Sequence, residues 1–279
     1  MPDFDPRLTP ARRDLAASFL RGRVEAERFV EGVAQEVVNA TAPVRREPSH
    51  GSPLDTEALK GERVTVYETD DEGWAWGQLE SDGYVGWLPM AALLAPGPAP
   101  THRVAALRTF VFPEASIKAP PAEALPLGAR IRIERMQDAF AVSTNGYLPA
   151  RHLVPLESAE PDFVAVAERF VGAPYLWGGK TSLGVDCSGL VQVSLNACGI
   201  QSPRDSDMQE AALGSLSKLA ELKRGDLVFW KGHVAIARDA MTLIHANAFH
   251  MQVAVEPAAE AIARIRAGGG EVTSVRRIR

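Results

Sequence analysis

Three residues in the C-terminal part of the chain have the types and order needed for nucleophilic catalysis. Cys187 stands in the segment Asp186-Cys-Ser-Gly-Leu190, where a helix is expected to begin. The partial positive charge of a helix N-terminus favours a thiolate and lowers the pKa of a cysteine placed there. Backbone N–H groups of the same turn can stabilise the oxyanion that forms at an attacked carbonyl. An isolated cysteine is more often a small buried hydrophobic residue, which is the role we expect for Cys198.

Two histidines follow at a spacing that suits a general base and a residue that orients it. His233 begins an expected strand in Gly232-His-Val-Ala-Ile236, and His245 ends the next one in Leu243-Ile-His-Ala-Asn247. Neighbouring antiparallel strands would bring the two imidazoles together, one as base for the thiol and the other holding its tautomer. A lone histidine on a strand is more often structural. A cysteine and two histidines in this order nevertheless indicate a thiol nucleophile.

The elements around these residues predict an α+β domain over about residues 157–279. The spacing of apolar residues predicts a helix over 162–171, and a glycine-rich loop and the Cys187 helix come next. Strands are expected at 226–230, 234–237, 242–245 and 272–275. Helices followed by a sheet are typical of an α+β fold.

The N-terminal half has the alternating pattern of small β-barrels. Strands are expected at 63–67, 74–79 and 83–88, with turns rich in Asp and Gly between them. The pattern of 59–66 and 82–89 returns in weaker form at 126–133 and 145–149, which indicates a duplicated all-β unit. Both units resemble bacterial SH3-like domains. We expect a short helix opening at Thr9-Pro10, and we expect the tryptophans at 74, 76 and 87 to pack in the barrel core and between domains.

Four segments follow from these patterns. They are an N-terminal helical or extended segment (1–35), a first SH3-like domain (36–96), a second SH3-like domain (101–156) and the α+β domain (157–279). The proline-rich stretch Pro96-Gly-Pro-Ala-Pro100 reads as a stiff linker between the two barrels. A length of 279 residues fits two domains or three small ones.

Composition excludes several classes of function. The net charge is −5 and no stretch concentrates Lys and Arg, which argues against a nucleic-acid partner. No apolar run reaches the ~20 residues of a membrane span, and the first residues have no secretory pattern. We therefore expect a soluble, cytoplasmic protein with no membrane association and no obligate protein partner. Six histidines without paired cysteines predict no metal site, and no motif calls for a cofactor.

Six short segments together resemble the NlpC-type family of papain-like cysteine peptidases. They are Pro174-Tyr-Leu-Trp-Gly-Gly179, Asp186-Cys-Ser-Gly-Leu190, Pro203-Arg-Asp-Ser206, Gly225-Asp-Leu-Val-Phe229, Gly232-His-Val-Ala-Ile236 and Ile244-His-Ala-Asn247. SH3-like domains before such a peptidase resemble, more narrowly, the cytoplasmic γ-D-glutamyl-L-diamino acid endopeptidases of the dipeptidyl-peptidase VI type. One departure is the connection before His233, which is shorter than the usual family loop.

The resemblance implies a function and a set of site residues. The expected activity is hydrolysis of the γ-D-Glu–L-diamino acid bond in murein stem peptides with a free N-terminal L-Ala, during cell-wall peptide recycling. It implies Cys187 as nucleophile, His233 as base and His245 as the third polar residue. The residues implied to bind the murein-derived peptide are Tyr175, Asp186, Ser188 and Ser206, with Tyr84 and Glu47 of the first SH3-like domain at the substrate amine. Two alternatives stay open: a wall-binding adaptor with an inert peptidase-like domain, and an acyltransferase on the same fold.

Overall fold

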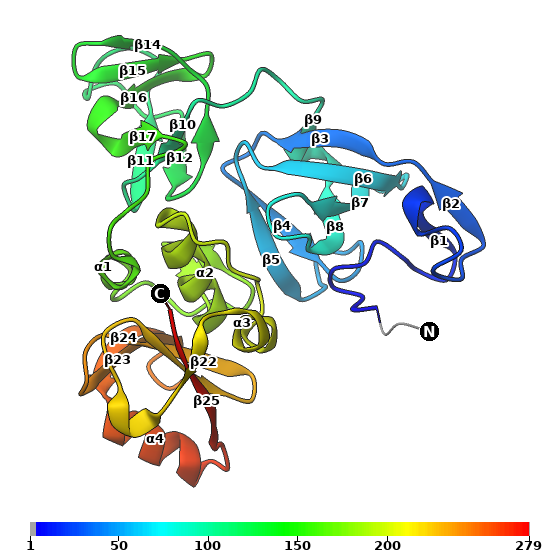
Figure 1. Cartoon of the computed structure of the whole chain (residues 1–279). Coiled ribbons are helices and arrows are strands. Elements are labelled where there is room, and N and C mark those ends of the chain that lie inside the picture. The colour runs from blue at the N-terminus through cyan, green and yellow to red at the C-terminus, as the bar shows by residue number, and fades with distance from the viewer. Residues whose placement is uncertain (1–3, 279) are drawn as a thin grey trace. The chain divides into compact units, whose positions relative to one another are not determined.

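The computed structural model describes residues 4–278, and the chain divides into two compact units between Leu156 and Glu157 (Figure 1). The predicted segments 1–35 and 157–279 therefore each include end residues, 1–3 and 279, that lie outside the described part. Within residues 4–278, no helix combines the length and the apolar character that a membrane crossing requires.

The first barrel of the N-terminal unit is built from one large sheet. Its seven strands run in the order β5-β4-β8-β7-β6-β3-β9. The bounds are β3 (Val33–Val37), β4 (Thr41–Arg45), β5 (Leu54–Leu59), β6 (Arg63–Thr69), β7 (Trp74–Leu79), β8 (Val85–Pro89) and β9 (Leu93–Leu94). Because side chains alternate along a strand, Ala75 and Leu79 of β7 point into the core and meet Leu88 of β8. The strands expected at 63–67, 74–79 and 83–88 are therefore present.

The first segment forms strands where a helix was expected. Thr9-Pro10 opens no α-helix, because the Arg12 N–H bonds to the Leu15 carbonyl and the Ala17 N–H to the Pro10 carbonyl, which turns the chain back. Strand β1 (Leu15–Ala17) then pairs in parallel with β2 (Arg28–Val30), and only a short 3-10 turn, Ser18–Leu20, lies between them. The helix prediction is wrong here because backbone pairing outweighs the weak apolar spacing.

The three tryptophans of the first barrel are buried, but on the face opposite its core. Trp74 and Trp76 flank Ala75 on β7, so they point away from the barrel interior, and Trp87 of β8 joins them. Together with Leu15 of the N-terminal segment they form a second apolar cluster. The expectation that they fill the barrel core is corrected accordingly, because the alternation places Ala75 there.

The rest of the N-terminal unit is also all-β. It contains β10 (His102–Val104), β11 (Arg108–Val111), β12 (Glu123–Pro126), β13 (Arg130–Ile131), β14 (Ile133–Gln137), β15 (Phe140–Ser143), β16 (Gly146–Pro149) and β17 (Leu153–Pro155). These strands form two- and three-stranded sheets around a core that includes Leu125, Ala141 and Leu148.

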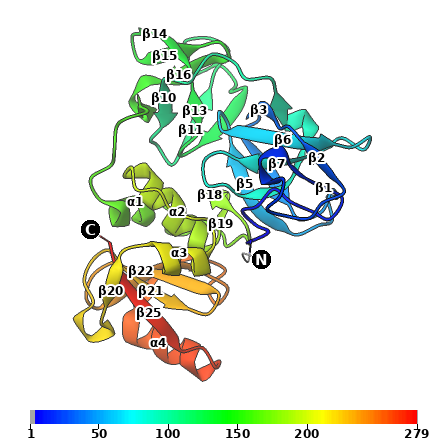
Figure 2. The ribbon, with the colours of Figure 1, turned by 45° about the vertical axis from the view of Figure 1, so that its right-hand side comes forward.

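The C-terminal unit is a six-stranded antiparallel sheet with helices on its two faces. The order is β20-β25-β21-β22-β23-β24. The bounds are α1 (Phe163–Glu168), β18 (Lys180–Thr181), β19 (Gly184–Val185), α2 (Cys187–Ala197), α3 (Ser206–Ala212), β20 (Ser215–Ser217), β21 (Asp226–Trp230), β22 (His233–Ala237), β23 (Thr242–Asn247), β24 (Gln252–Pro257), α4 (Ala258–Ala267) and β25 (Val272–Arg277). Figures 1 and 2 show α2 on one side of this sheet and α4 on the other. The α+β prediction is confirmed, although β20, β24, α3 and α4 were not anticipated.

Candidate active site

Cys187 is the first residue of helix α2, and its local sequence explains why the helix starts there. Asp186 is the N-cap, and its Oδ1 accepts the Gly189 N–H at 2.7 Å. Position 189 requires glycine, since a Cβ there would lie 2.3 Å from the Gly179 carbonyl oxygen. The cap and the close approach together fix the cysteine at the helix N-terminus, where its residue exposure is only 7%.

Burial makes Cys187 a thiol rather than a thiolate in the resting protein. Burial, and after it the charge of Asp186, raise the pKa of Cys187 to about 12. The backbone N–H groups of Val234 and Ser188 and the cation of Arg204 act in the opposite direction without overcoming this. The expectation of a pKa lowered by the helix N-terminus is therefore wrong for this state, because the loss of water around the sulfur outweighs the dipole.

The two predicted histidines lie side by side on neighbouring strands of the sheet. His233 begins β22 directly after the two-residue turn Lys231-Gly232, and His245 lies on the adjacent antiparallel strand β23. His233 Nε2 is 2.8 Å from His245 Nδ1. Burial, helped by the nearby charges of His245 and Arg264, lowers the pKa of His233 to about 3, so its imidazole is neutral at pH 7.

A buried carboxylate and an arginine continue this chain of hydrogen bonds beyond His245. Glu256 of β24 places Oε1 2.6 Å from His245 Nε2. Arg264 of α4 grips both carboxylate oxygens, with Nη2 to Oε1 at 2.6 Å and Nη1 to Oε2 at 2.5 Å. Although burial alone would raise it, these hydrogen bonds lower the pKa of Glu256 to about 2. Sequence reasoning missed both residues, because β24 and α4 were not predicted.

A second buried ion pair holds the residues on either side of Cys187. Arg204, with 1% exposure, donates Nη1 to Asp186 Oδ1 at 2.9 Å and Nη2 to Oδ2 at 2.7 Å. Its Nη1 also donates to Ser188 Oγ at 2.9 Å. Asp186 and Ser188, two of the expected substrate residues, are thus joined to a cation that the sequence analysis quoted in a motif but gave no role.

Two further predicted site residues flank this region. Tyr175 is half-buried and its N–H donates to the Met251 carbonyl at 2.9 Å. Burial, followed by the charges of Cys187 and Asp186, raises the pKa of Tyr175 to about 12, so its phenol stays protonated. Ser206 is the half-buried first residue of α3. That helix is tied to α2 through the Gln209 side chain, which donates to the Ser188 carbonyl at 2.9 Å.

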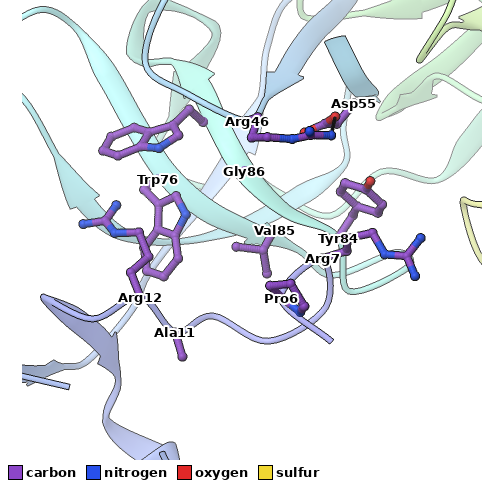
Figure 3. Close-up of a pocket in the computed structure, with 11 residues that line it drawn as sticks. Pro6, Arg7, Ala11, Arg12, Arg46, Asp55, Trp76, Tyr84, Val85 and Gly86 are labelled. Carbon is purple, nitrogen blue, oxygen red and sulfur yellow. Dashed lines mark hydrogen bonds and ion pairs between the residues drawn. The ribbon is translucent and has the colours of Figure 1, made fainter. Parts of the chain in front are cut away.

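Tyr84 and Glu47 belong to the N-terminal unit, where Tyr84 is buried and Glu47 is exposed. Tyr84 packs in the barrel core with 4% exposure and lines a cavity of about 410 Å³ together with Arg7, Arg46 and Asp55 (Figure 3). Arg46 and Asp55 are themselves paired at 2.8 Å. Glu47 is exposed in the turn between β4 and β5, and its backbone N–H donates to Ser52 Oγ at 3.1 Å.

The described residues include no candidate metal site. Within residues 4–278, no three His, Cys, Asp or Glu side chains are grouped so that they could hold a metal ion. Both cysteines are free thiols. Cys198, the C-cap of α2, lies at the opposite end of the helix from Cys187.

A cysteine at the start of a helix that packs on an antiparallel sheet, with a histidine pair on two neighbouring strands, is the arrangement of a papain-like fold. Comparison with known families gives the same result. Residues 172–267 match the NlpC/P60 family, and residues 44–93 match the bacterial dipeptidyl-peptidase SH3 domain. The chain therefore carries an NlpC/P60 domain, and a bacterial SH3 domain precedes it.

Two curated relatives and one solved structure are similar to this chain over most of its length. A γ-D-glutamyl-L-lysine dipeptidyl-peptidase of Bacillus cereus is 26% identical over 230 residues, which cover 72% of this chain and 68% of the relative. The enzyme of that name from Bacillus subtilis is 30% identical over 196 residues, or 63% of this chain and 64% of the relative. The crystal structure of an NlpC/P60 family protein from Bacillus cereus superposes with a TM-score of 0.74 at 20% identity, covering 88% of this chain and 99% of that one. At this identity the structural match shows the fold.

Proposed function

We propose that this protein is a cysteine peptidase that hydrolyses the γ-D-Glu–L-diamino acid bond of murein stem peptides. The observation that carries the proposal is the neutral imidazole pair His233–His245, with ring nitrogens 2.8 Å apart. His233 is followed on its strand by Val234, whose N–H faces the Cys187 sulfur. A buried thiol beside a neutral base has the two parts that nucleophilic attack on an amide requires. The names of the Bacillus relatives support the choice of substrate.

In the proposed reaction, Cys187 attacks the γ-carbonyl carbon of D-Glu while His233 removes the thiol proton. The C–N bond then breaks and His233 returns the proton to the leaving amine. Water attacks the thioester in the second half of the reaction, with His233 again as base, and releases the dipeptide and the free thiol. Because the thiol and imidazole are both neutral at rest, the proton moves during the attack rather than before it.

Substrate recognition is proposed on the residues that the family resemblance implies. Tyr175 lies within electrostatic range of Cys187, and Asp186 and Ser188 precede and follow the cysteine. Ser206 begins α3, whose Gln209 contacts Ser188. Because Arg204 already neutralises Asp186, a substrate ammonium would need a further carboxylate. For the recognition of L-Ala, the family resemblance implies Tyr84 and Glu47. A role in cytoplasmic recycling of murein peptides belongs to the same proposal and rests on the resemblance.

The test is incubation of the purified protein with L-Ala-γ-D-Glu-diaminopimelate. Mass spectrometry should detect L-Ala-γ-D-Glu and free diaminopimelate in equal amounts, and Cys187→Ala should produce neither. Absence of the dipeptide from folded wild-type protein would refute the proposal. Binding of peptidoglycan without cleavage would support the adaptor alternative, and transfer of the dipeptidyl group to an added amine in place of water would support the acyltransferase.

A further inference from the structure

The carboxylate behind the histidine pair determines where the hydrogens of that pair sit. His245 Nε2 lies 2.6 Å from Glu256 Oε1, and the pKa of Glu256 is lowered to about 2, so the carboxylate is ionised and can only accept. His245 Nε2 must then carry the hydrogen. Since burial also lowers the pKa of His245 and favours its neutral form, its Nδ1 is left without one.

The same logic extends to the next ring. The bare Nδ1 of His245 is an acceptor, and it lies 2.8 Å from His233 Nε2. His233 Nε2 must therefore carry the hydrogen of that neutral ring, which leaves His233 Nδ1 with a lone pair. This is the one ring nitrogen of His233 that His245 does not occupy, so it is the nitrogen available to the thiol of Cys187.

We propose that Glu256, clamped by Arg264, is a positioning residue that fixes the tautomers of His245 and His233 so that His233 Nδ1 is free to take the thiol proton. The catalytic role of Glu256 rests on the proposed function, whereas the tautomers of the two histidines are a property of the folded protein. When the thiol proton reaches Nδ1, His233 becomes a cation. The ionised Glu256 then stabilises it through His245, as a buried carboxylate does behind a catalytic histidine.

Arg264 holds the carboxylate without changing this arrangement. Its two nitrogens contact both oxygens of Glu256, and its guanidinium lies 4.2 Å from the centre of the Phe249 ring. This grip leaves Glu256 Oε1 aimed at His245. Two other ionisable groups lie nearby. His250 Nδ1 is 4.0 Å from Glu256 Oε1 and hydrogen-bonds to Asn247, and Glu260 acts on Arg264.

The first test is nitrogen NMR of the histidine rings in wild-type protein labelled with ¹⁵N-histidine. Ring nitrogens with and without hydrogen have separate shifts, so the spectrum reads the tautomers directly and needs no substrate. We expect hydrogen on Nε2 and none on Nδ1 in both rings at pH 7. Hydrogen on Nδ1 of either ring would overturn the proposal. If the tautomers are as expected but no γ-glutamyl peptide is cleaved, the proposed function fails and the positioning role of Glu256 in the histidine pair stands.

Two variants then separate positioning from general support of the fold. In Glu256→Gln the side-chain amide can accept or donate at His245, so both tautomers should be populated and kcat should fall by about 10- to 100-fold. Arg264→Met leaves the carboxylate in place, so the wild-type tautomers should persist with a smaller loss of kcat. Glu271→Gln, which removes an exposed ion pair with Arg266 at the end of α4, is the matched control and should change neither.

The titration of His245 should move in opposite directions in the two variants. Glu256 raises the pKa of His245 and Arg264 lowers it, so the pH at which the second proton binds should fall in Glu256→Gln and rise in Arg264→Met. A structural disturbance alone would expose the ring in both variants and shift both titrations upward. Shifts of one sign, or unchanged tautomers in Glu256→Gln, would therefore contradict the proposal.

Discussion

Replacing Arg204 by methionine tests the buried ion pair that supports the start of helix α2. Methionine has a long unbranched side chain, but it lacks the guanidinium that donates to Asp186 at 2.9 and 2.7 Å and to Ser188 at 2.9 Å. The charge of Asp186 stays buried, and the backbone N–H groups of Gly178 and Gly189 still donate hydrogen bonds to its carboxylate.

The expected cost follows from the burial of both partners. The side chains of Arg204 and Asp186 are 1% and 10% exposed, and removal of one member of such a pair typically costs ~3–5 kcal/mol because the other charge is left without compensation. Arg169→Met is the matched control: Arg169 pairs with Glu160 at 2.7 Å, but its side chain is 37% exposed, so its loss should cost at most ~1 kcal/mol.

The assay is urea unfolding followed by hydrogen exchange and mass spectrometry of peptides from α2, which reports on the C-terminal unit by itself. Adding Asp186→Asn to Arg204→Met should recover part of the lost free energy of unfolding, since the unpaired charge is then gone. The reasoning is refuted if Arg204→Met lowers the free energy of unfolding by no more than Arg169→Met does. It is also refuted if Asp186→Asn lowers the free energy of unfolding as much in the Arg204→Met background as it does alone.

Three further predictions concern the proposed reaction. Cys187→Ala and His233→Ala should abolish dipeptide release while Cys198→Ala keeps most of it, and inactivation by thiol reagents that follows Cys198 would contradict the site assignment. The pKa of Cys187 is raised to about 12 and that of His233 is lowered to about 3. The rate at which iodoacetamide alkylates Cys187 should therefore rise about tenfold per pH unit from pH 6 to 9. A constant rate in this range would instead indicate a thiolate–imidazolium pair. Acetylation of the substrate amine should lower kcat/KM by roughly 30-fold to several thousand-fold, corresponding to ~2–5 kcal/mol. Tyr84→Phe should reduce the ratio of kcat/KM between the free and the acetylated peptide. Equal cleavage of both peptides by the wild-type protein would exclude recognition of the amine.

The sequence was sufficient for the elements that carry the proposed nucleophile and base. A helix was expected to begin in the segment Asp186-Cys-Ser-Gly-Leu190, and α2 does begin at Cys187, because Asp is a residue type that favours the N-cap position. The strands that carry His233 and His245 are joined by a short turn, between Ala237 and Thr242, so they pair as neighbours. Apolar alternation likewise predicted β7 with its observed bounds.

Local patterns failed where backbone pairing or burial decided the outcome. Leu15 was expected on a helix, but its strand pairs with β2 and packs on tryptophans of the first barrel. The pKa of Cys187 was expected to fall at the helix N-terminus, and it rises because the surrounding chain removes water from the sulfur. Neither pairing across sequence distance nor the degree of desolvation can be read from the residues beside a position.

The partners of the charged groups were decided by the tertiary structure alone. Arg204 reaches Asp186 from 18 positions along the chain. Glu256 meets His245 because β24 pairs in one particular register with β23, and Arg264 meets Glu256 because α4 folds back on that strand. Sequence determines that a charged side chain is present, whereas register and packing determine which opposite charge or ring nitrogen it faces. For this protein the proposed reactive groups could be named from the sequence, whereas their ionisation and hydrogen bonding are set by the folded chain.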